Sequence, residues 1–379
     1  MKLHTAFEKE GKVAMLKENK KINEIILHVG LHKTGTTSIQ QTLFLKGNSN
    51  FLESKGYLYP NSWNVNHSIP VYNLFCDHPE KYHINIKNEY SIAEIRDINK
   101  RYLKRLEAEI VERDQTKLII SGEDISSLSL DNLIALKKYL RSISTNDVTI
   151  RVIIYVRNPI TWSISAIQTM IKGGETYQNT FQHLSFILIN LFRNNITKFV
   201  QVFGKEQVDI YTFEEAVAHA SGPVGHFLSS LGFSDNEIGN FNIVRANESA
   251  SQTAVDIMSF INEKLPMIRN GKLHEKRTNG DILPLLNIKG VKFDIPYSDK
   301  KKLFENSQDD VKWLKDSYGI DYSFLKEPQK NEVINEFTEE TIMDIKKACF
   351  NPQLTPTMRG LILEYLQKKI INNSKDTIN

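Results

Sequence analysis

An apolar strand, a glycine-containing loop and an amphipathic helix follow one another near the start of the chain. The apolar run over residues 24–29 leads into a loop over 30–35, and a helical pattern then covers 36–46 and is expected to stop at Gly47. Such a loop turns backbone N–H groups, and the positive end of the helix, toward an anion. This order predicts a phosphate-binding site at one edge of an α/β sheet.

Further strands and helices alternate along the next part of the chain. Short apolar runs rich in β-branched residues predict buried strands over 117–121, 148–156 and 208–211. Helical patterns lie over 130–142, 159–172 and 186–203. The alternation predicts an α/β fold, a P-loop-like three-layer sandwich with a mostly parallel central sheet. Ligands of such sheets bind at the carboxyl ends of the strands.

The strand pattern fades near residue 247. Helical patterns follow over 251–264, 298–318, 338–349 and 355–371. We therefore expect an α/β core over 22–246 and a helical C-terminal part over 247–371, packed on the core within the same domain. The glycine- and proline-containing stretch 266–297 is expected to be a long surface excursion, which either borders a substrate cleft or is a plain loop.

Charge and composition exclude several classes of protein. The chain has 48 Lys and Arg against 45 Asp and Glu, a net charge of +3, which gives no ground for nucleic-acid binding. Cys76 and Cys349 stand alone, so neither a disulfide framework nor a zinc site is indicated. The first residues are too charged for a secretory signal, and the longest apolar stretch, 186–192, is too short to span a membrane. We therefore expect a cytoplasmic protein without an integral membrane segment.

The phosphate loop has the glycine spacing of a Walker A loop but a displaced lysine. Gly30 and Gly35 are separated by four residues and Thr37 supplies the hydroxyl, but Thr36 occupies the lysine position. The lysine of the loop is Lys33. Nucleoside triphosphate sites need their lysine at the β and γ phosphates and a hydroxyl on Mg²⁺. The displacement instead favours a donor with one phosphate carrying the transferred group, since Lys33 is placed for the bridging oxygen.

A lysine followed by Thr-Gly-Thr-Thr resembles the 5′-phosphosulfate loop of the sulfotransferase superfamily, including its bacterial-type members. The resemblance implies that the donor is 3′-phosphoadenosine-5′-phosphosulfate (PAPS), that the product is 3′,5′-ADP, and that no metal is needed. It implies that Lys33 acts at the leaving group. The implied 5′-phosphate ligands are Thr34, Gly35, Thr36, Thr37 and Ser38. The plainer alternative is a helix-capping turn without function.

An arginine directly follows the strand predicted over 148–156. Asn158 is expected to cap the next helix and Pro159 to begin it, so Arg157 lies at the carboxyl edge of the sheet. A guanidinium there can hold a phosphate through two hydrogen bonds. Arg-Asn-Pro with Ser165 eight residues after the arginine resembles the 3′-phosphate motif of the superfamily, which implies that Arg157 and Ser165 bind that phosphate. A structural salt bridge of Arg157 is the alternative.

Transfer to a hydroxyl needs a base within hydrogen-bond reach of the acceptor. Glu123 follows the strand 117–121, where several sulfotransferases place an active-site residue, so the resemblance implies Glu123 as the base. Its alternative role is to cap the next helix. His67 is a second candidate, as base or acceptor-binding residue, unless it is simply a solvated loop histidine. His28 is expected to be structural, and His32 either contacts a substrate or only shapes the loop.

The resemblance covers about residues 25–213 and departs from cytosolic sulfotransferases in places. Ser38 replaces a tryptophan that helps to hold adenine in those enzymes, so adenine recognition stays open between Trp63 and Trp162. Their C-terminal Arg-Lys-Gly signature is absent, and Arg245 is a candidate in its place. The expected function is sulfuryl transfer from PAPS to a hydroxyl or amine of a carbohydrate, glycolipid or small metabolite. The alternatives are a P-loop kinase using ATP and magnesium, and a non-catalytic nucleotide-binding protein.

Overall fold

The structure of the protein is a computed structural model that describes residues 21–246, 249–278, 280–322, 326–329 and 338–376. The chain forms two compact units. The first contains the described residues up to 158 together with 192–246, and the second contains 159–191 together with the described residues after 248. Residues 159–191, which we expected in the α/β core, belong to the second unit because their helices pack against C-terminal helices.

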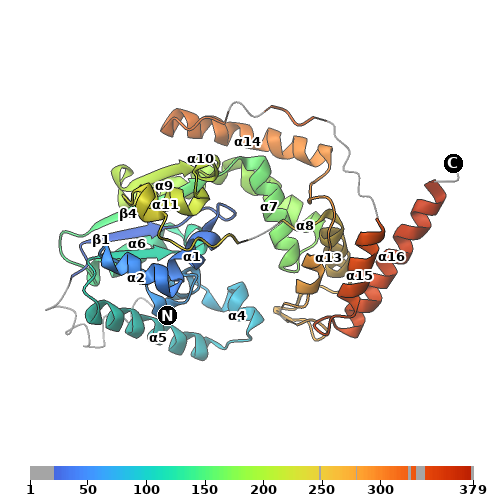
Figure 1. Ribbon diagram of the computed structural model, residues 1–379, viewed down its shortest axis with the longest axis horizontal. Coiled ribbons are helices and arrows are strands. Elements are labelled where there is room, and N and C mark those ends of the chain that lie inside the picture. Colours follow the sequence, from blue (N-terminus) through green and yellow to red (C-terminus); the bar gives the residue numbers. More distant parts are fainter. Residues whose placement is uncertain (1–20, 247–248, 279, 323–325, 330–337, 377–379) are drawn as a thin grey trace. The chain divides into compact units, whose positions relative to one another are not determined.

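The first unit is built on a sheet that contains β1 and β4 (Figure 1). Its five strands are parallel, in the order β2-β3-β1-β4-β5. The strands are β1 (Glu24–His28), β2 (Tyr57–Leu58), β3 (Lys117–Ser121), β4 (Thr149–Val156) and β5 (Val208–Thr212). The predicted α/β fold class is confirmed, and the four predicted strands are present. In the described part of the first unit, β2 is the one strand that was not predicted, because a strand of two residues is too short to give a periodic signal.

The register brings the carboxyl ends of three strands to one edge of the sheet. His28, the last residue of β1, pairs with Ser121 of β3 and with Ile153 of β4. Beyond β1 the chain stays beside β4, since the Leu31 N–H donates to the carbonyl of Tyr155 at 3.2 Å. The segments that follow β1, β3 and β4 therefore begin at the same edge, where ligands of parallel sheets bind.

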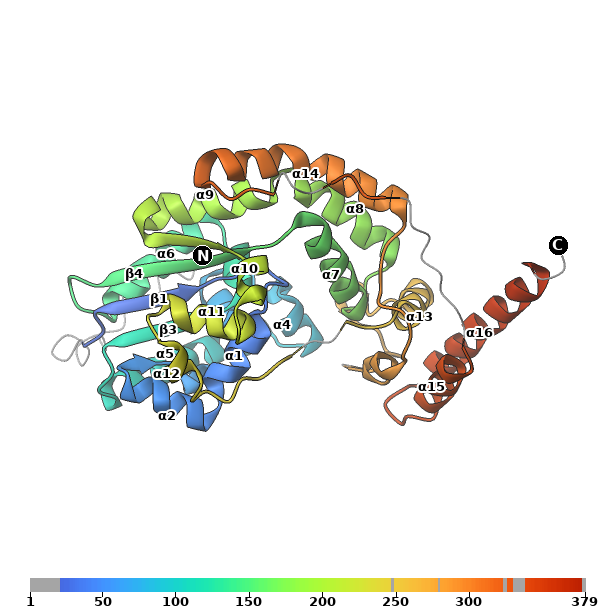
Figure 2. The ribbon, with the colours of Figure 1, turned by 45° about the horizontal axis from the view of Figure 1, so that its top comes forward.

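Helices cover both faces of this sheet. The helices on one face, which share a buried apolar cluster with the strands, are α1 (Thr36–Phe44), α2 (Lys46–Ser54), α11 (Gly222–Ser230) and α12 (Asp235–Ile238). Strand residues that point to the other face, such as Leu27 and Leu118, are also fully buried. There α6 (Leu130–Ser142) and α9 (Leu191–Phe203) lie side by side, joined by a hydrogen bond from Lys137 to the carbonyl of Val202. Figure 2 shows α9 and α11 on opposite sides of β4, which confirms the three-layer sandwich.

Several helices of the first unit were not predicted from the sequence. They are α3 (Ser68–Phe75), α4 (His83–Lys87), α5 (Ile92–Glu112) and α10 (Phe213–Ala218). The long helix α5 is polar over most of its surface, but a reciprocal capping box of Ser91 and Glu94 fixes its start. The predicted helix stop at Gly47 is wrong, because α1 ends at Phe44 and Gly47 lies inside α2.

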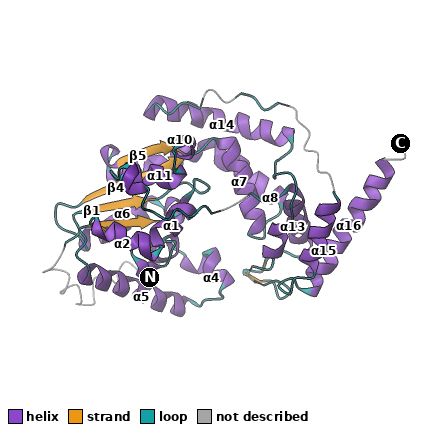
Figure 3. Cartoon of the chain, viewed as in Figure 1, coloured by secondary structure: helices purple, strands orange, loops and turns teal. Residues whose placement is uncertain are grey.

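The second unit is largely helical (Figure 3), as predicted for the C-terminal part. Its helices are α7 (Pro159–Lys172), α8 (Tyr177–Ile187), α13 (Gln252–Lys264), α14 (Tyr297–Tyr318), α15 (Glu339–Cys349) and α16 (Pro356–Asp376). Helix α7 packs against α8, α13 and α14, and α13 packs against α16. Within the described part of the chain, no helix combines the length and the apolar character needed to cross a membrane.

The stretch 266–297 is an ordered part of the second unit wherever it is described. It contains a short hairpin of β6 (Ile268–Arg269) and β7 (Lys272–Leu273), followed by a 3₁₀ turn. Arg277 donates to both carboxylate oxygens of Asp281, at 2.7 and 3.1 Å, and both side chains are fully buried. The same guanidinium donates to the side chain of Asn262 in α13 and to the carbonyl of Leu265. These bonds tie the excursion to the helices of its unit.

Candidate active site

The loop between β1 and α1 has a left-handed backbone at three positions. The φ angles are 41° at Gly30, 70° at Lys33 and 83° at Gly35. A Cβ at position 35 would lie 2.9 Å from the Cβ of Pro223 in α11, so this position needs glycine for space as well as for its φ angle. Lys33 adopts a conformation that is unfavourable for a residue with a side chain, and the surrounding contacts must therefore hold it.

Helix α1 begins without a side-chain cap. Its N-cap is Gly35, no side chain accepts a hydrogen bond from the first turn, and that turn contains no acidic residue. The positive end of α1 is therefore not neutralised from within the helix, which suits the binding of an anion. Thr37 and Ser38 lie in this turn and are partly exposed.

Other side chains in and next to the loop are buried or form hydrogen bonds with the protein backbone. The hydroxyl of Thr34 is buried and donates to the carbonyl of Leu31 at 2.5 Å, and Thr36 is almost fully buried. The hydroxyl of Ser38 accepts a hydrogen bond from the Ala246 N–H at 3.0 Å. The side chain of Thr34 therefore closes the loop, and only its backbone is left for the predicted contact with a phosphate.

Arg157 lies directly against this loop. Its guanidinium donates a hydrogen bond to the carbonyl of Lys33 at 2.8 Å, and its Cζ lies 4.9 Å from the ring centre of Phe213. The next N–H, of Asn158, donates to the carboxylate of Glu214 at 3.0 Å. Arg157 follows β4 and Lys33 follows β1, so the pairing of these adjacent strands explains the contact. The two predicted phosphate-binding motifs are thus side by side.

Ser165 and the two tryptophan candidates have different surroundings. Ser165 lies in α7 of the second unit, is partly exposed, and its carbonyl accepts a hydrogen bond from the Thr169 hydroxyl. Its role beside Arg157 stays a prediction. Trp63 is fully buried and donates to the carbonyl of Tyr102 at 2.9 Å, so its ring belongs to the interior of the first unit. Trp162, in α7, is also buried.

Glu123 lies just beyond β3 and is held by two side-chain amides. Gln40 donates to Oε2 at 2.9 Å and Asn66 donates to Oε1 at 3.1 Å. Gln40 belongs to α1, so the carboxylate is connected to the helix that begins at the phosphate loop. Glu123 caps neither of the next helices, because the 3₁₀ helix Glu123–Ser127 has Gly122 as its N-cap and α6 has Ser129. The side chain is partly exposed and has a fixed orientation from which it can accept a proton.

His67 is fully buried, unlike a solvated loop histidine. Its Nδ1 accepts a hydrogen bond from the Ser121 N–H at 3.2 Å, and its Nε2 donates to the carbonyl of Pro60 at 3.1 Å. The ring stacks on Tyr59 with 4.3 Å between the ring centres. Burial lowers the pKa of His67 to about 3. With both nitrogens occupied and the ring neutral, His67 is placed as a structural residue and not as a base.

His28 is a second buried histidine, directly beneath the loop. Its Nδ1 is 2.8 Å from the Ser121 hydroxyl, and its ring packs against Tyr155 and Phe227. Burial lowers its pKa to about 3 as well. His28 therefore contributes to the packing between the sheet and α11, and the sequence correctly indicates a structural residue.

A cluster around Asp124 was not expected from the sequence. Nε2 of His32 lies 3.2 Å from Oδ1 of Asp124, and the Tyr82 hydroxyl donates to Oδ2 at 2.6 Å. Burial opposes the charge on Asp124, but the bonds from His32 and Tyr82 outweigh it and lower the pKa of Asp124. Burial likewise opposes a proton on His32, yet Asp124 and the charge of Glu123 raise the pKa of His32. His32, the residue before Lys33, is thus held by Asp124, which lies just beyond the end of β3.

No metal-binding group of three or more His, Cys, Asp or Glu side chains occurs among the residues that the structure describes. What the described site offers is an uncapped helix start, a lysine-containing loop, a strand-end guanidinium and an oriented carboxylate. Chemically, these groups suit the binding of a phosphorylated ligand and the removal of a proton from a second one.

No model of a protein family matches the sequence, and no curated protein matches it. Several solved structures are similar to this chain. A sulfotransferase from Alicyclobacillus acidocaldarius is 15% identical and matches over 65% of this chain and 94% of its own, with a TM-score of 0.36. The sulfotransferase domain from the curacin biosynthetic pathway is 13% identical and matches over 60% of this chain and 80% of its own, with a TM-score of 0.34.

A third similar structure is retinol dehydratase in complex with androsterone and the inactive cofactor PAP. It is 12% identical and matches over 80% of this chain and 84% of its own, with a TM-score of 0.34. All three similarities are at 15% identity or less. The fold class itself follows from the strand order and register given above.

Proposed function

We propose that this protein transfers a sulfuryl group from PAPS to a hydroxyl or amine of an acceptor. The observation that carries the proposal is the hydrogen bond from Arg157 to the carbonyl of Lys33, which joins the two predicted phosphate-binding motifs at one edge of the sheet. Such a pair suits a nucleotide with phosphates at two positions of its ribose, as in PAPS. In ATP the phosphates form a single chain, which would not need a second site.

The residues of the chain fit such a donor. The start of α1 and the hydroxyls of Thr37 and Ser38 would hold the 5′-phosphate, together with the backbone of Thr34, Gly35 and Thr36. Arg157 would hold the 3′-phosphate. The part of Ser165, which belongs to the second unit, stays a prediction from the sequence. Lys33 would place its ammonium beside the oxygen between phosphate and sulfur, where negative charge develops as the bond breaks.

We propose Glu123, and not His67, as the base. In the transfer step the acceptor oxygen or nitrogen forms a bond to sulfur, the bond from sulfur to the phosphate oxygen breaks, and the acceptor proton passes to the Glu123 carboxylate. Gln40 orients that carboxylate from α1, the same helix whose start faces the proposed donor site. Base and donor site are therefore positioned by one rigid element.

The donor is tested by thermal unfolding with added nucleotides. We expect 3′,5′-ADP to raise the melting temperature without magnesium, and the effect to disappear in Lys33→Ala and Arg157→Ala. Lys46→Ala removes an exposed lysine at the start of α2 and should keep the effect. A response to ATP only with magnesium would indicate a kinase instead and would refute the proposal.

Turnover and acceptor need a separate experiment. Incubation with radiolabelled PAPS and a panel of carbohydrates, glycolipids and small metabolites should label one class, and the label should disappear with Lys33→Ala. Binding of 3′,5′-ADP without transfer to any extract of the source organism would indicate a non-catalytic nucleotide-binding protein. The cytoplasmic location expected from the sequence stays a prediction.

A further inference from the structure

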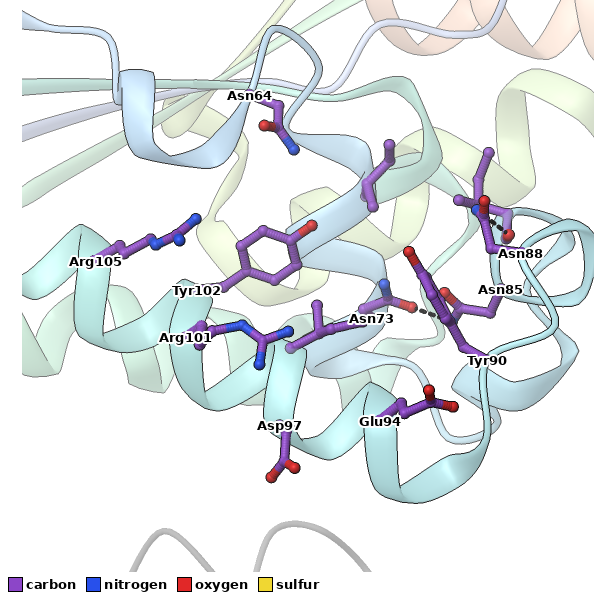
Figure 4. Close-up of a pocket in the computed structure, with 13 residues that line it drawn as sticks. Asn64, Asn73, Asn85, Asn88, Tyr90, Glu94, Asp97, Arg101, Tyr102 and Arg105 are labelled. Atoms are coloured by element: carbon purple, nitrogen blue, oxygen red, sulfur yellow. Dashed lines mark hydrogen bonds between the residues drawn. The ribbon is translucent and has the colours of Figure 1, made fainter.

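A polar pocket of about 470 Å³ lies in the first unit between α3, α4 and α5 (Figure 4). This volume is in the range of small-molecule sites, which are usually lined by apolar side chains. Here ten of the thirteen lining residues are polar or charged and three are isoleucines; the amides and phenols are Asn64, Asn73, Asn85, Asn88, Tyr90 and Tyr102. The pocket is therefore built for a ligand that forms many hydrogen bonds.

Buried amides form the floor of the pocket. Asn85 donates to Oδ1 of Asn73 at 2.6 Å and to the carbonyl of Pro79 at 2.7 Å, and Asn99 donates to the carbonyl of Asn73 at 2.8 Å. Asn73 and Asn85 are 2% and 1% exposed. The side-chain nitrogen of Asn73 donates to none of the described residues, and Figure 4 shows it turned toward the pocket between the two tyrosines. A fixed donor is thus left for a ligand.

Two tyrosines form opposite walls. Tyr102, whose carbonyl is held by the Trp63 indole, directs its hydroxyl into the pocket (Figure 4). Tyr90, Arg101 and Arg105 line the same pocket. Burial and the nearby Tyr90 raise the pKa of Tyr102, against the effect of Arg105 and Arg101. The hydroxyl of Tyr102 forms no hydrogen bond within the described part of the chain. Tyr rings can also pack on the C–H face of a sugar ring.

Charged groups of both signs border the pocket. Arg101 and Arg105 lie one turn apart on α5, and neither forms an ion pair or hydrogen bond with a described residue. Glu94 and Asp97 also line the pocket, and Glu94 is already engaged in capping α5. Two positive and two negative groups cancel formally, so the wall offers donors and acceptors without selecting an anion. Hydroxyl groups, which both donate and accept, suit such a wall.

We propose that this pocket binds a sugar unit of a carbohydrate acceptor. That the bound sugar belongs to the acceptor rests on the proposed function, whereas the binding of a sugar depends on the pocket alone. The amides of Asn73 and Asn64, the Tyr102 hydroxyl and the two free guanidinium groups supply hydrogen bonds from several sides. The tyrosine rings supply the apolar contact that a sugar ring needs.

One short segment connects the pocket with the proposed base. Asn64 lines the pocket, Asn66 donates to Oε1 of Glu123 at 3.1 Å, and Ser68 accepts a hydrogen bond from the Asp124 N–H at 3.0 Å. Two residues along a chain span at most about 7 Å, so the pocket rim lies within about one sugar unit of the residue that orients Glu123. In this proposal, an oligosaccharide held in the pocket would extend toward the base with its next unit.

The pocket is tested first by equilibrium binding, without any donor. Maltotriose, cellotriose and triacetylchitotriose are titrated separately and followed by saturation-transfer difference NMR, with inorganic phosphate as the anion control. We expect at least one trisaccharide to bind and phosphate not to compete. Tyr102→Phe should weaken binding about fivefold, the value of one lost hydrogen bond, and Arg101→Gln with Arg105→Gln about tenfold or more. Circular dichroism melting checks that each variant is folded.

Arg96→Gln is the matched control, because it removes an exposed arginine of α5 that does not line the pocket. It should bind the trisaccharide as the wild type does. The proposal is overturned if no trisaccharide binds, if phosphate displaces the sugar, or if Tyr102→Phe and the double arginine variant bind as tightly as Arg96→Gln. The protein could also bind the sugar, with the losses expected for these variants, but fail to bind 3′,5′-ADP. That result would support the pocket and refute the sulfotransferase proposal separately.

Discussion

The guanidinium of Arg157 donates a hydrogen bond to the backbone carbonyl of Lys33 at 2.8 Å. Lys33 has a φ angle of 70°, so the bond is made to a residue whose backbone is under strain. Arg157 thus has two tasks, one toward the loop and one proposed toward a phosphate. A substitution at this position changes the shape of the loop as well as its charge.

Arg157→Lys separates these tasks, because it keeps the charge and loses the planar fork that reaches the Lys33 carbonyl. We expect the affinity for 3′,5′-ADP to fall about tenfold or more and the free energy of unfolding to fall by about 1 kcal/mol. Isothermal titration calorimetry and urea unfolding measure the two effects. Arg141→Lys, at an exposed position of α6, is the control. Equal affinities in Arg157→Lys and wild type would contradict the assignment.

Gly35→Ala should damage the loop, whereas Gly47→Ala should not. At position 35 the φ angle is 83° and a Cβ would lie 2.9 Å from Pro223, so we expect a loss of about 1–3 kcal/mol in the free energy of unfolding, with loss of 3′,5′-ADP binding. At position 47, inside α2, an added Cβ meets nothing within 4 Å, and the helix should gain about 0.5–1 kcal/mol. The opposite order of stabilities would show that the loop is not held as described.

Glu123→Gln keeps the size of the side chain and removes its ability to take a proton. We expect kcat to fall about 10²–10⁴-fold while the affinity for 3′,5′-ADP is unchanged. The comparison is His67→Asn, which should lower the melting temperature but, after correction for the folded fraction, should retain much more activity. A larger loss of kcat in folded His67→Asn than in Glu123→Gln would assign the base to His67 and refute our assignment.

The two buried histidines predict that the protein loses stability in mild acid. His28 and His67 have their pKa values lowered to about 3 by burial, so below about pH 6.5 the unfolded chain binds protons that the folded chain does not. Each of these two histidines should therefore lower the free energy of unfolding by up to about 1.4 kcal/mol for every unit by which the pH falls between 6.5 and 3. Urea unfolding at pH 7, 6 and 5 measures the slope. His67→Phe should make it shallower, and His78→Asn, at an exposed position, should not.

Asp281→Asn should destabilise the second unit strongly. The substitution leaves Arg277 fully buried without its carboxylate partner, which typically costs about 3–5 kcal/mol. Urea unfolding followed by circular dichroism measures the loss. Glu340→Gln breaks an exposed ion pair with Lys289 in the same unit and should leave the midpoint unchanged. Equal midpoints in the two variants would mean that the buried pair does not hold the 266–297 stretch.

The elements that the sequence predicts well are those with a short-range signal. The strands are continuous apolar runs, and Gly30, Gly35 and Pro159 mark the points where the chain turns into a helix. Since the carboxyl ends of parallel strands lie at the same edge of a sheet, these local signals alone predict that Lys33 and Arg157 lie at one edge. The same reasoning located Glu123.

The contacts that could not be predicted from the sequence are those between residues far apart along the chain. Tyr82 has no local feature that connects it with Asp124, and nothing in Gln40 indicates a bond to Glu123. The burial of His67 follows from its stacking on Tyr59, in a region with only a two-residue strand. The membership of 159–191 in the second unit likewise depends on contacts with helices more than eighty residues later in the chain, as in the hydrogen bond from Asn262 of α13 to the carbonyl of Ile171.

The position of β1 in the middle of the sheet has a consequence for biosynthesis. β1 leaves the ribosome before any of its hydrogen-bonding neighbours, since its partners end at residues 121 and 156. At the usual rate of translation it waits on the order of ten seconds for β4. The Lys33 loop is shaped by β4 and Arg157, so the nascent chain carries no formed phosphate loop until then. A nucleotide can therefore assist folding only after more than a third of the chain has been made.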